Sequence, residues 1–249
     1  MLWYKSWLET RWRFLVGLVL IFCSAGATVF TYLEVSKVLP MFPESGGGSM
    51  GARFREAVEL VREYRGYVWS NWFRQNLTQA GTLFAILLGT GGMIAGSSLF
   101  TLSMPVSRNR VVAVRAAIGL AELFVLITIP SLLISFLSPL IRESYGVRIA
   151  LVHSACLFVA CSVFFGLALL LSTAFSDPWR PLLIALLAAI VIGAAGHRPE
   201  LSRFSLFAVM SGERYFRSGA VPWAGLVAAA AVAAALHVLA AMNIARRDF

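Results

Sequence analysis

Residues 149–176 read IALVHSACLFVACSVFFGLALLLSTAFS, a run of 28 residues that contains no Asp, Glu, Lys or Arg. A helix needs about 20 mostly apolar residues to cross the roughly 30 Å hydrocarbon core of a bilayer, so this stretch is long enough to span a membrane. It lacks the alternation of polar and apolar residues over about ten positions that marks the strands of a membrane barrel. The stretch therefore predicts a transmembrane helix.

The composition of the whole chain agrees with a lipid environment. Of the 249 residues, 59% are hydrophobic and 13% are charged, whereas soluble domains have about 45–50% apolar and about 25% charged residues. A single core of this length cannot bury so much apolar surface, and the remainder would need lipid or a partner to cover it. The net charge of +9 comes from short basic clusters between apolar runs. Such clusters flank membrane spans, so they argue against nucleic-acid binding.

Other charge-poor stretches extend the prediction to one all-α transmembrane domain over residues 1–249. Its six spans would cover residues of about 14–33, 77–99, 116–140, 149–174, 180–196 and 220–243. A cleavable signal is the alternative for the first span, because Ser24-Ala25-Gly26-Ala27 resembles a cleavage site.

The chain has three cysteines, all within predicted spans: Cys23, Cys156 and Cys161. We expect them to pack as small apolar side chains, without a metal site or a disulfide.

Six spans place both chain ends on one side of the membrane. Arg11 and Arg13 precede the first span, and Glu34 with Lys37 follow it, so we predict a multi-pass protein of the cell (inner or plasma) membrane with both ends cytoplasmic. This topology puts nine Lys and Arg residues inside and twelve outside, contrary to the usual bias. Six of those twelve fall in the long outer loop 34–76.

Two amphipathic segments lie outside the predicted spans. Residues 2–13 carry Trp3, Trp7 and Leu8 on one helical face, which predicts an elbow helix lying flat in the membrane interface. The alternative is an aromatic belt that extends the first span. In the outer loop, residues 50–64 have helical periodicity. With Trp69, Trp72 and Phe73 they would form a lid or skirt at the outer surface, or else a solvated helix.

The segment between the second and third spans, residues 101–115, reads TLSMPVSRNRVVAVR. Ser103 is a possible N-cap and Pro105 is tolerated in a first helical turn, so a short helix could present Arg108 and Arg110 to another protein. The alternative is a basic anchor that contacts lipid phosphates.

The chain resembles the permease subunits of type-two ATP-binding-cassette (ABC) exporters. The resemblance rests on the run Leu102-Ser103-Met104-Pro105-Val106-Ser107-Arg108, on the elbow helix, on the Gly-rich end of the second span, on the six spans and on the basic tail. It implies a hydrophobic or amphipathic substrate, moved out of the cytoplasm by alternating access at the interface with a second permease copy, identical or different. Separate ATPase subunits would bind ATP and Mg.

The resemblance also assigns the contacts with the ATPase. Met104, Pro105, Arg108 and Arg110 would touch it, and the segment 175–180 with Asp177 would make the second contact. The run Gly89-Thr90-Gly91-Gly92 lacks the Gly-Lys-Ser/Thr ending of a phosphate-binding loop. We therefore expect a transport subunit that is not itself an enzyme, with no cofactor of its own. The glycines of this run would let helices pack closely.

Glu122 lies inside a predicted span, where an acid is costly and faces a partner or a cavity. It could pair with Arg115 two turns away or with a residue of another span, line a cavity, or carry protons. His153 and His237 are expected in packing or interfacial positions.

Two other functions compete. An intramembrane enzyme would need several acid, histidine or serine groups at one depth, but Glu122, His153 and His237 are isolated in the sequence, and no hydrolase or zinc-protease motif occurs. We assign no catalytic residue and no metal ligand. A secondary transporter, or another six-span membrane protein, is the nearer alternative. The long first loop has no counterpart between the fourth and fifth spans, which disfavours an inverted repeat.

Overall fold

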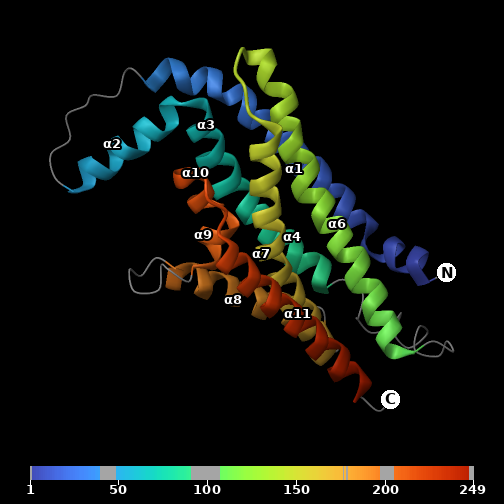
Figure 1. Ribbon diagram of the computed structural model, residues 1–249. Coiled ribbons are helices and arrows are strands. Elements are labelled where there is room, and N and C mark those ends of the chain that lie inside the picture. The colour runs from blue at the N-terminus through green and yellow to red at the C-terminus, as the bar shows by residue number, and fades with distance from the viewer. Residues whose placement is uncertain are drawn as a thin grey trace.

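The computed structural model describes residues 2–39, 49–90, 107–175, 177, 179–196 and 205–246, and these contain helices and no strand. The helices, labelled as in Figure 1, are α1 (Leu2–Val38), α2 (Ser49–Arg62), α3 (Tyr64–Tyr67), the π-helix η2 (Val68–Asn76), α4 (Leu77–Thr90), α6 (Arg108–Leu137), the 3₁₀ helix η3 (Ser138–Ile141), α7 (Val147–Ala174), α8 (Trp179–Gly196), α9 (Leu206–Met210), α10 (Glu213–Ser218) and α11 (Trp223–Ala245).

Five of these helical segments are long and apolar enough to cross a membrane. They are Leu2–Val38, Asn109–Ile141, Val147–Ala174, Trp179–Gly196 and Trp223–Ala245. They contain, in order, most of the predicted first, third, fourth, fifth and sixth spans. The prediction of an all-helical, multi-pass membrane protein is confirmed at this level.

The second predicted span differs from its expected form. Its first part is α4, and its last residues, 91–99, lie outside the described residues. Helix α4 is preceded without a break by α3 and η2, so residues 64–90 form one helical column, here called the 64–90 column. Trp69, Trp72 and Phe73 are fully buried in the bundle. They therefore do not belong to a surface skirt, and the second half of the expected outer loop is part of the helical core.

The N-terminal segment also differs from its expected form. The sequence suggests an elbow helix at 2–13 followed by a separate span, whereas the structure has one continuous helix, α1, over Leu2–Val38. No proline interrupts these residues, and the Thr10 hydroxyl bonds back to the Ser6 carbonyl within the helix. The first turns of α1 are held against α6 by polar contacts described below. These contacts hold residues 2–13 in line with the rest of α1.

Helix α7 lies at the centre of the bundle and packs against α4, α6 and α11, while α1 runs along α6 (Figure 1). Close approach of α4 to α7 depends on Gly89. A Cβ at this position would lie 2.6 Å from the Phe165 carbonyl oxygen and 2.8 Å from the Ala168 Cβ. The expectation that this glycine permits close helix packing is confirmed, whereas Gly91 and Gly92 lie outside the described residues. Both chain termini and the start of α6 lie at the same end of the bundle (Figure 1).

Candidate functional site

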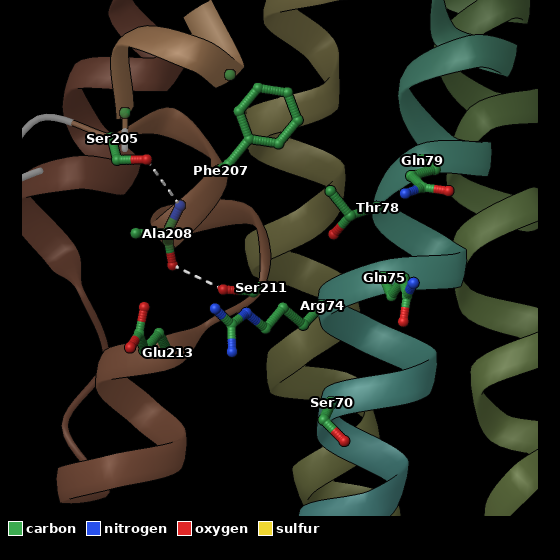
Figure 2. A pocket seen from close by; sticks show the side chains of 12 residues that line it. Ser70, Arg74, Gln75, Thr78, Gln79, Ser205, Phe207, Ala208, Ser211 and Glu213 are labelled. Carbon is green, nitrogen blue, oxygen red and sulfur yellow. Dashed lines mark hydrogen bonds between the residues drawn. The ribbon is translucent and has the colours of Figure 1, made fainter. Parts of the chain in front are cut away.

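A cavity of about 650 Å³ lies between the 64–90 column and the segment formed by α8, α9 and α10 (Figure 2). Most of the residues that line it are polar. They are Ser70, Arg74, Gln75, Thr78 and Gln79 from the column, and Ser205, Ser211 and Glu213 from the opposite wall. Phe207, Ala208, Gly193 and Gly196 complete the lining. The volume lies in the range of about 300–1,000 Å³ that is usual for small-molecule sites.

The column contributes an exposed polar stripe to this cavity. Arg74, Gln75 and Gln79 are all exposed, and Gln75 and Gln79 are one helical turn apart. Polar and charged groups at membrane depth are costly unless they face water, a partner or a polar ligand. These exposed polar side chains suit a cavity that holds water or a polar ligand.

Arg74 carries the positive charge of the cavity. Figure 2 shows its side chain reaching from the column toward Ser211 and Glu213. Its guanidinium carbon lies 5.5 Å from the centre of the Trp69 ring, a cation–π contact. In the part of the chain that the structure describes, no carboxylate oxygen lies within 4.0 Å of this guanidinium. Arg74 is thus positioned on an aromatic ring and open to an anion.

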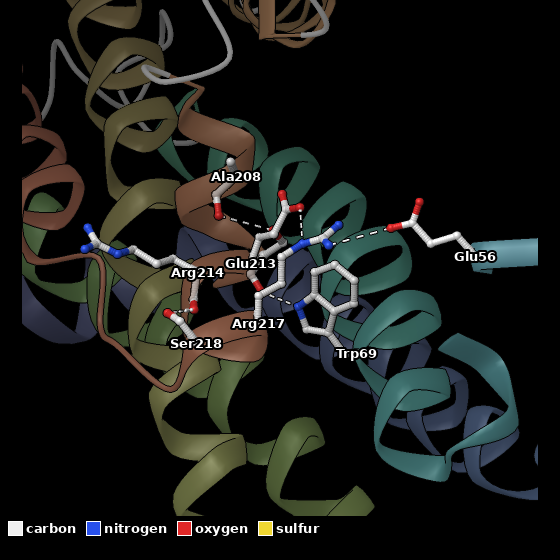
Figure 3. Close-up of polar contacts among 8 residues, drawn as sticks. Glu56, Trp69, Ala208, Glu213, Arg214, Arg217 and Ser218 are labelled. Atoms are coloured by element: carbon white, nitrogen blue, oxygen red, sulfur yellow. Dashed lines mark hydrogen bonds and ion pairs between the residues drawn. The ribbon is translucent and has the colours of Figure 1, made fainter. Parts of the chain in front are cut away.

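Glu213, the acid among the lining residues, is already paired. Its Oε1 accepts a hydrogen bond of 3.0 Å from Nε of Arg217, one turn later in α10. Nη1 of the same arginine lies 3.7 Å from Oε1 of Glu56 in α2 (Figure 3). The Arg217–Glu56 pair is largely exposed, so this ion pair contributes little to stability. Arg217 is thus shared between two carboxylates, Glu213 and Glu56, whereas Arg74 has no carboxylate within 4.0 Å among the described residues.

The wall made by α9 and α10, here called the 206–218 hairpin, is anchored through one carbonyl group. The Ser211 oxygen accepts a hydrogen bond of 2.9 Å from Nε1 of Trp69, and Nδ1 of the buried His153 lies 3.1 Å from it. The ring of Phe216 stacks on Trp69 with a centroid distance of 4.3 Å. The hairpin is therefore fixed to both the column and α7.

Two glycines allow the hairpin to lie so close. Gly212 has a φ of +61°, and a Cβ there would lie 2.5 Å from Nδ1 of His153. Gly196 ends α8, and a Cβ there would lie 2.6 Å from the Ser205 hydroxyl oxygen. Ser205 in turn caps α9, because its hydroxyl accepts from the Ala208 amide.

The sequence-predicted ATPase contacts lie away from this cavity. Met104 and Pro105 are outside the described residues, and of Arg108 only the backbone is described. Arg108 and Arg110 lie in the first turn of α6, and Arg110 is exposed. Asp177 lies between α7 and α8, where its Oδ1 accepts from the Trp179 amide at 2.8 Å. Its other oxygen lies 3.3 Å from Nε of Arg180.

A set of polar contacts ties α1 to its neighbours near the start of α6. Arg115 pairs with Glu9, and the Arg115 side chain is only 8% exposed. Nη1 of Arg13 donates to the Leu87 carbonyl near the end of α4, at 2.9 Å. Helix α1 is thereby fixed to helices on both sides of the segment 91–107.

Glu122 is buried in α6, and Oε1 accepts a hydrogen bond from the Thr10 hydroxyl in α1. The suggested pairing of Glu122 with Arg115 is not formed, because Arg115 turns to Glu9 on α1 instead. The partner of Glu122 in the structure is Thr10, which lies in the segment expected as the elbow helix and not in a predicted span. Glu122 is not among the residues that line the polar cavity.

Both span histidines occupy packing positions. His153 stacks against Phe73, and Nδ1 of His237 lies 2.6 Å from the Ala233 carbonyl of its own helix. Among the described residues, no three His, Cys, Asp or Glu side chains form a group that could hold a metal ion.

The sequence interpretation missed the polar cavity. Its signal was the spacing of Arg74, Gln75 and Gln79 at the entry to an apolar run. Residues 34–76 were interpreted as a loop, so Arg74 and Gln75 were placed outside the bundle.

The fold and this site define a multi-pass helical membrane protein with a polar cavity beside its spanning helices. Comparisons of the chain with protein-family models, with characterised proteins and with solved structures found no match.

Proposed function

We propose that the protein is the permease subunit of an ABC exporter, which moves a hydrophobic or amphipathic substrate out of the cytoplasm. The observation that carries the proposal is the polar cavity between the 64–90 column and the 206–218 hairpin. A bundle with a purely structural role has no need for exposed Arg74, Gln75 and Gln79 among apolar helices, because such side chains are costly in lipid. A transport path, in contrast, requires a polar surface of this kind.

Energy would come from a separate ATPase subunit that binds ATP and Mg. It would dock where the start of α6 and the connection from α7 to α8 present Arg110 and Asp177. The contacts of α1 near this place support the proposal. Arg13 joins α1 to α4, and Glu9 joins it to α6, on the two sides of the segment 91–107. A displacement of that segment would therefore move three helices together.

A second permease copy, identical or related, would complete the path. In one copy the polar stripe of the column remains exposed. Alternating access requires that the polar surface be closed first to one side of the membrane and then to the other. The interface between two copies offers that enclosure, because six helices alone form a narrow bundle.

The test is co-purification of the full chain with the ATPase subunits encoded beside it, followed by measurement of ATP turnover. Arg108→Glu, Arg110→Glu and Pro105→Ala should weaken binding and lower turnover. Arg214→Glu is the matched control, because Arg214 is an exposed arginine on the 206–218 hairpin, remote from the proposed dock. If no ATPase binds, or if the four variants behave alike, the assignment is wrong. Substrate movement in vesicles that lack any ATPase would indicate a secondary transporter instead.

A further inference from the structure

A second cavity, of about 540 Å³, lies on the other side of α9. Its lining is apolar and includes Val163 of α7, Ile192 of α8, Leu206 and Val209 of α9, and Ala228 and Val232 of α11. These helices, apart from the short α9, are membrane-spanning candidates, so an apolar cavity among them is open to acyl chains.

Helix α9 separates the two cavities, because its residues alternate between them. Leu206 and Val209 face the apolar cavity, whereas Phe207 and Ala208 line the polar one. The neighbouring wall divides in the same way. Ile192 of α8 lines the apolar cavity, and the next residue, Gly193, lines the polar cavity. A polar and an apolar compartment thus share one thin partition.

Within the polar compartment, the Arg74 guanidinium is the group that favours an anion. Arg74 has no carboxylate partner among the described residues, while Glu213 is paired with Arg217. Guanidinium groups bind phosphate and carboxylate through paired hydrogen bonds. The hydroxyl of Ser70 and the amides of Gln75 and Gln79 lie in the same lining and can bond the uncharged oxygens of a headgroup.

We propose that the two cavities together bind one anionic amphipathic lipid, with its phosphate or carboxylate headgroup on Arg74 and an acyl chain in the apolar cavity beyond α9. The assignment rests on the proposed export function and narrows its substrate class. The charge of Arg74, which has no carboxylate partner among the described residues, identifies the headgroup as anionic. The adjoining apolar cavity among candidate spanning helices identifies the rest of the ligand as an acyl chain.

The experiment uses the purified full chain in phosphatidylcholine nanodiscs and measures binding of fluorescent phosphatidylglycerol. Arg74→Gln should weaken binding roughly tenfold, the effect expected when a charge-assisted hydrogen bond is lost. Arg74→Lys should retain most of the affinity, because the charge remains. Arg214→Gln is the matched control: it removes an arginine of the facing 206–218 hairpin, whose side chain points away from the contacts between Glu213 and Arg217 (Figure 3). Its binding should equal that of the unaltered chain.

The apolar cavity, which is proposed to hold the acyl chain, is tested separately. Ala228→Phe places a ring in the apolar cavity from an exposed position, so the protein should still fold, and binding should fall. Ala230→Phe, at another exposed position of α11 that is outside the lining, should have no effect. Soluble glycerophosphate added in excess should compete poorly, because it lacks the chain. Full competition by glycerophosphate would assign a free phosphate ester and overturn the lipid proposal.

The lipid proposal also fails if Arg74→Gln binds as well as the unaltered chain, or if Arg214→Gln loses as much affinity. Equal binding of fluorescent phosphatidylcholine would refute the anionic headgroup. These failures are distinct from failure of the export function, because association with the ATPase does not depend on Arg74. A chain that stimulates ATP turnover but binds phosphatidylglycerol no better than phosphatidylcholine would be a permease for another substrate.

Discussion

Thr10 and Glu122 lie 112 positions apart in the sequence, yet the Thr10 hydroxyl donates a hydrogen bond of 2.7 Å to Oε1 of Glu122. The acid is 5% exposed, and its second oxygen has no hydrogen-bond partner. Together with the Glu9–Arg115 pair, this bond joins the polar start of α1 to α6 along a buried face. Glu122 therefore holds two helices together.

The Thr10–Glu122 bond predicts a difference between two substitutions of the acid. Glu122→Gln keeps an oxygen that can accept from Thr10, so its stability should stay close to that of the unaltered protein. Glu122→Ala removes the acceptor, and the Thr10 hydroxyl then has only its intrahelical carbonyl partners, so the net cost should be about 0.5–1.5 kcal/mol. Thermal unfolding in detergent measures the difference. Equal loss in both variants would show that charge, not the hydrogen bond, stabilises this contact.

The Glu9–Arg115 pair predicts strong coupling in a double-mutant cycle. Removing one partner of a buried pair leaves an uncompensated charge and costs about 3–5 kcal/mol at full burial. Because Glu9 is 22% exposed, the cost here should lie at or below the lower end. Glu9→Gln and Arg115→Gln should each destabilise the protein, and the double variant should be more stable than the sum of the two losses indicates. Additive losses would contradict a direct interaction.

The hairpin turn at Gly212 predicts a graded response to alanine. Gly212 and Gly219 both have positive φ values, of +61° and +71°, so alanine at either position costs about 1–2 kcal/mol in backbone strain. Only at Gly212 does the new Cβ also meet the His153 ring, whereas nothing lies within 4 Å of a Cβ at Gly219. Gly212→Ala should therefore be the more destabilising. Protease accessibility of the 206–218 hairpin should rise in this variant and stay unchanged in Gly219→Ala.

How well each helix could be predicted from the sequence depends on whether its own residues or its tertiary contacts determine its burial. Five predicted spans coincide with helices that are long and apolar enough to cross a membrane, because long charge-free runs have few structures available in lipid. Residues 64–76 were missed because Arg65, Arg74 and Gln75 lower the local hydropathy, although Trp69, Trp72 and Phe73 on the same helix bury completely. Burial of one face against α7 and the hairpin is a tertiary effect, which average hydropathy does not report.

The candidate site was even less accessible from sequence. Its two walls are separated by more than a hundred residues, and the contacts that join them converge on one backbone carbonyl, that of Ser211. Any residue type supplies such an acceptor, so no motif marks it. The pairing of Glu9 with Arg115 was likewise invisible, since Glu122 was the nearer acid along the helix that carries Arg115.

The close approach of α4 to α7 predicts that Gly89 tolerates no side chain. In Gly89→Ala the new methyl would meet a backbone oxygen at 2.6 Å, and a backbone atom cannot move aside as a flexible side chain can. Overpacking of this kind costs about 1–3 kcal/mol. Gly26→Ala in α1 is the control, because its nearest neighbour is a Leu137 methyl at 4.0 Å. Thermal unfolding should show a clear loss for the first variant and none for the second.

Substitutions of Asp177 should separate its effect on the stability of the protein from its effect on the proposed ATPase contact. The carboxylate accepts from the Trp179 amide at the start of α8, a bond that an asparagine oxygen can also accept. Asp177→Asn should therefore keep the stability of the protein, while Asp177→Ala should lose about 1 kcal/mol with this cap. If the negative charge contacts the ATPase, Asp177→Asn will also lower ATP turnover of the complex. Normal turnover in Asp177→Asn, measured beside its unfolding temperature, would limit Asp177 to capping α8 and remove it from the proposed interface.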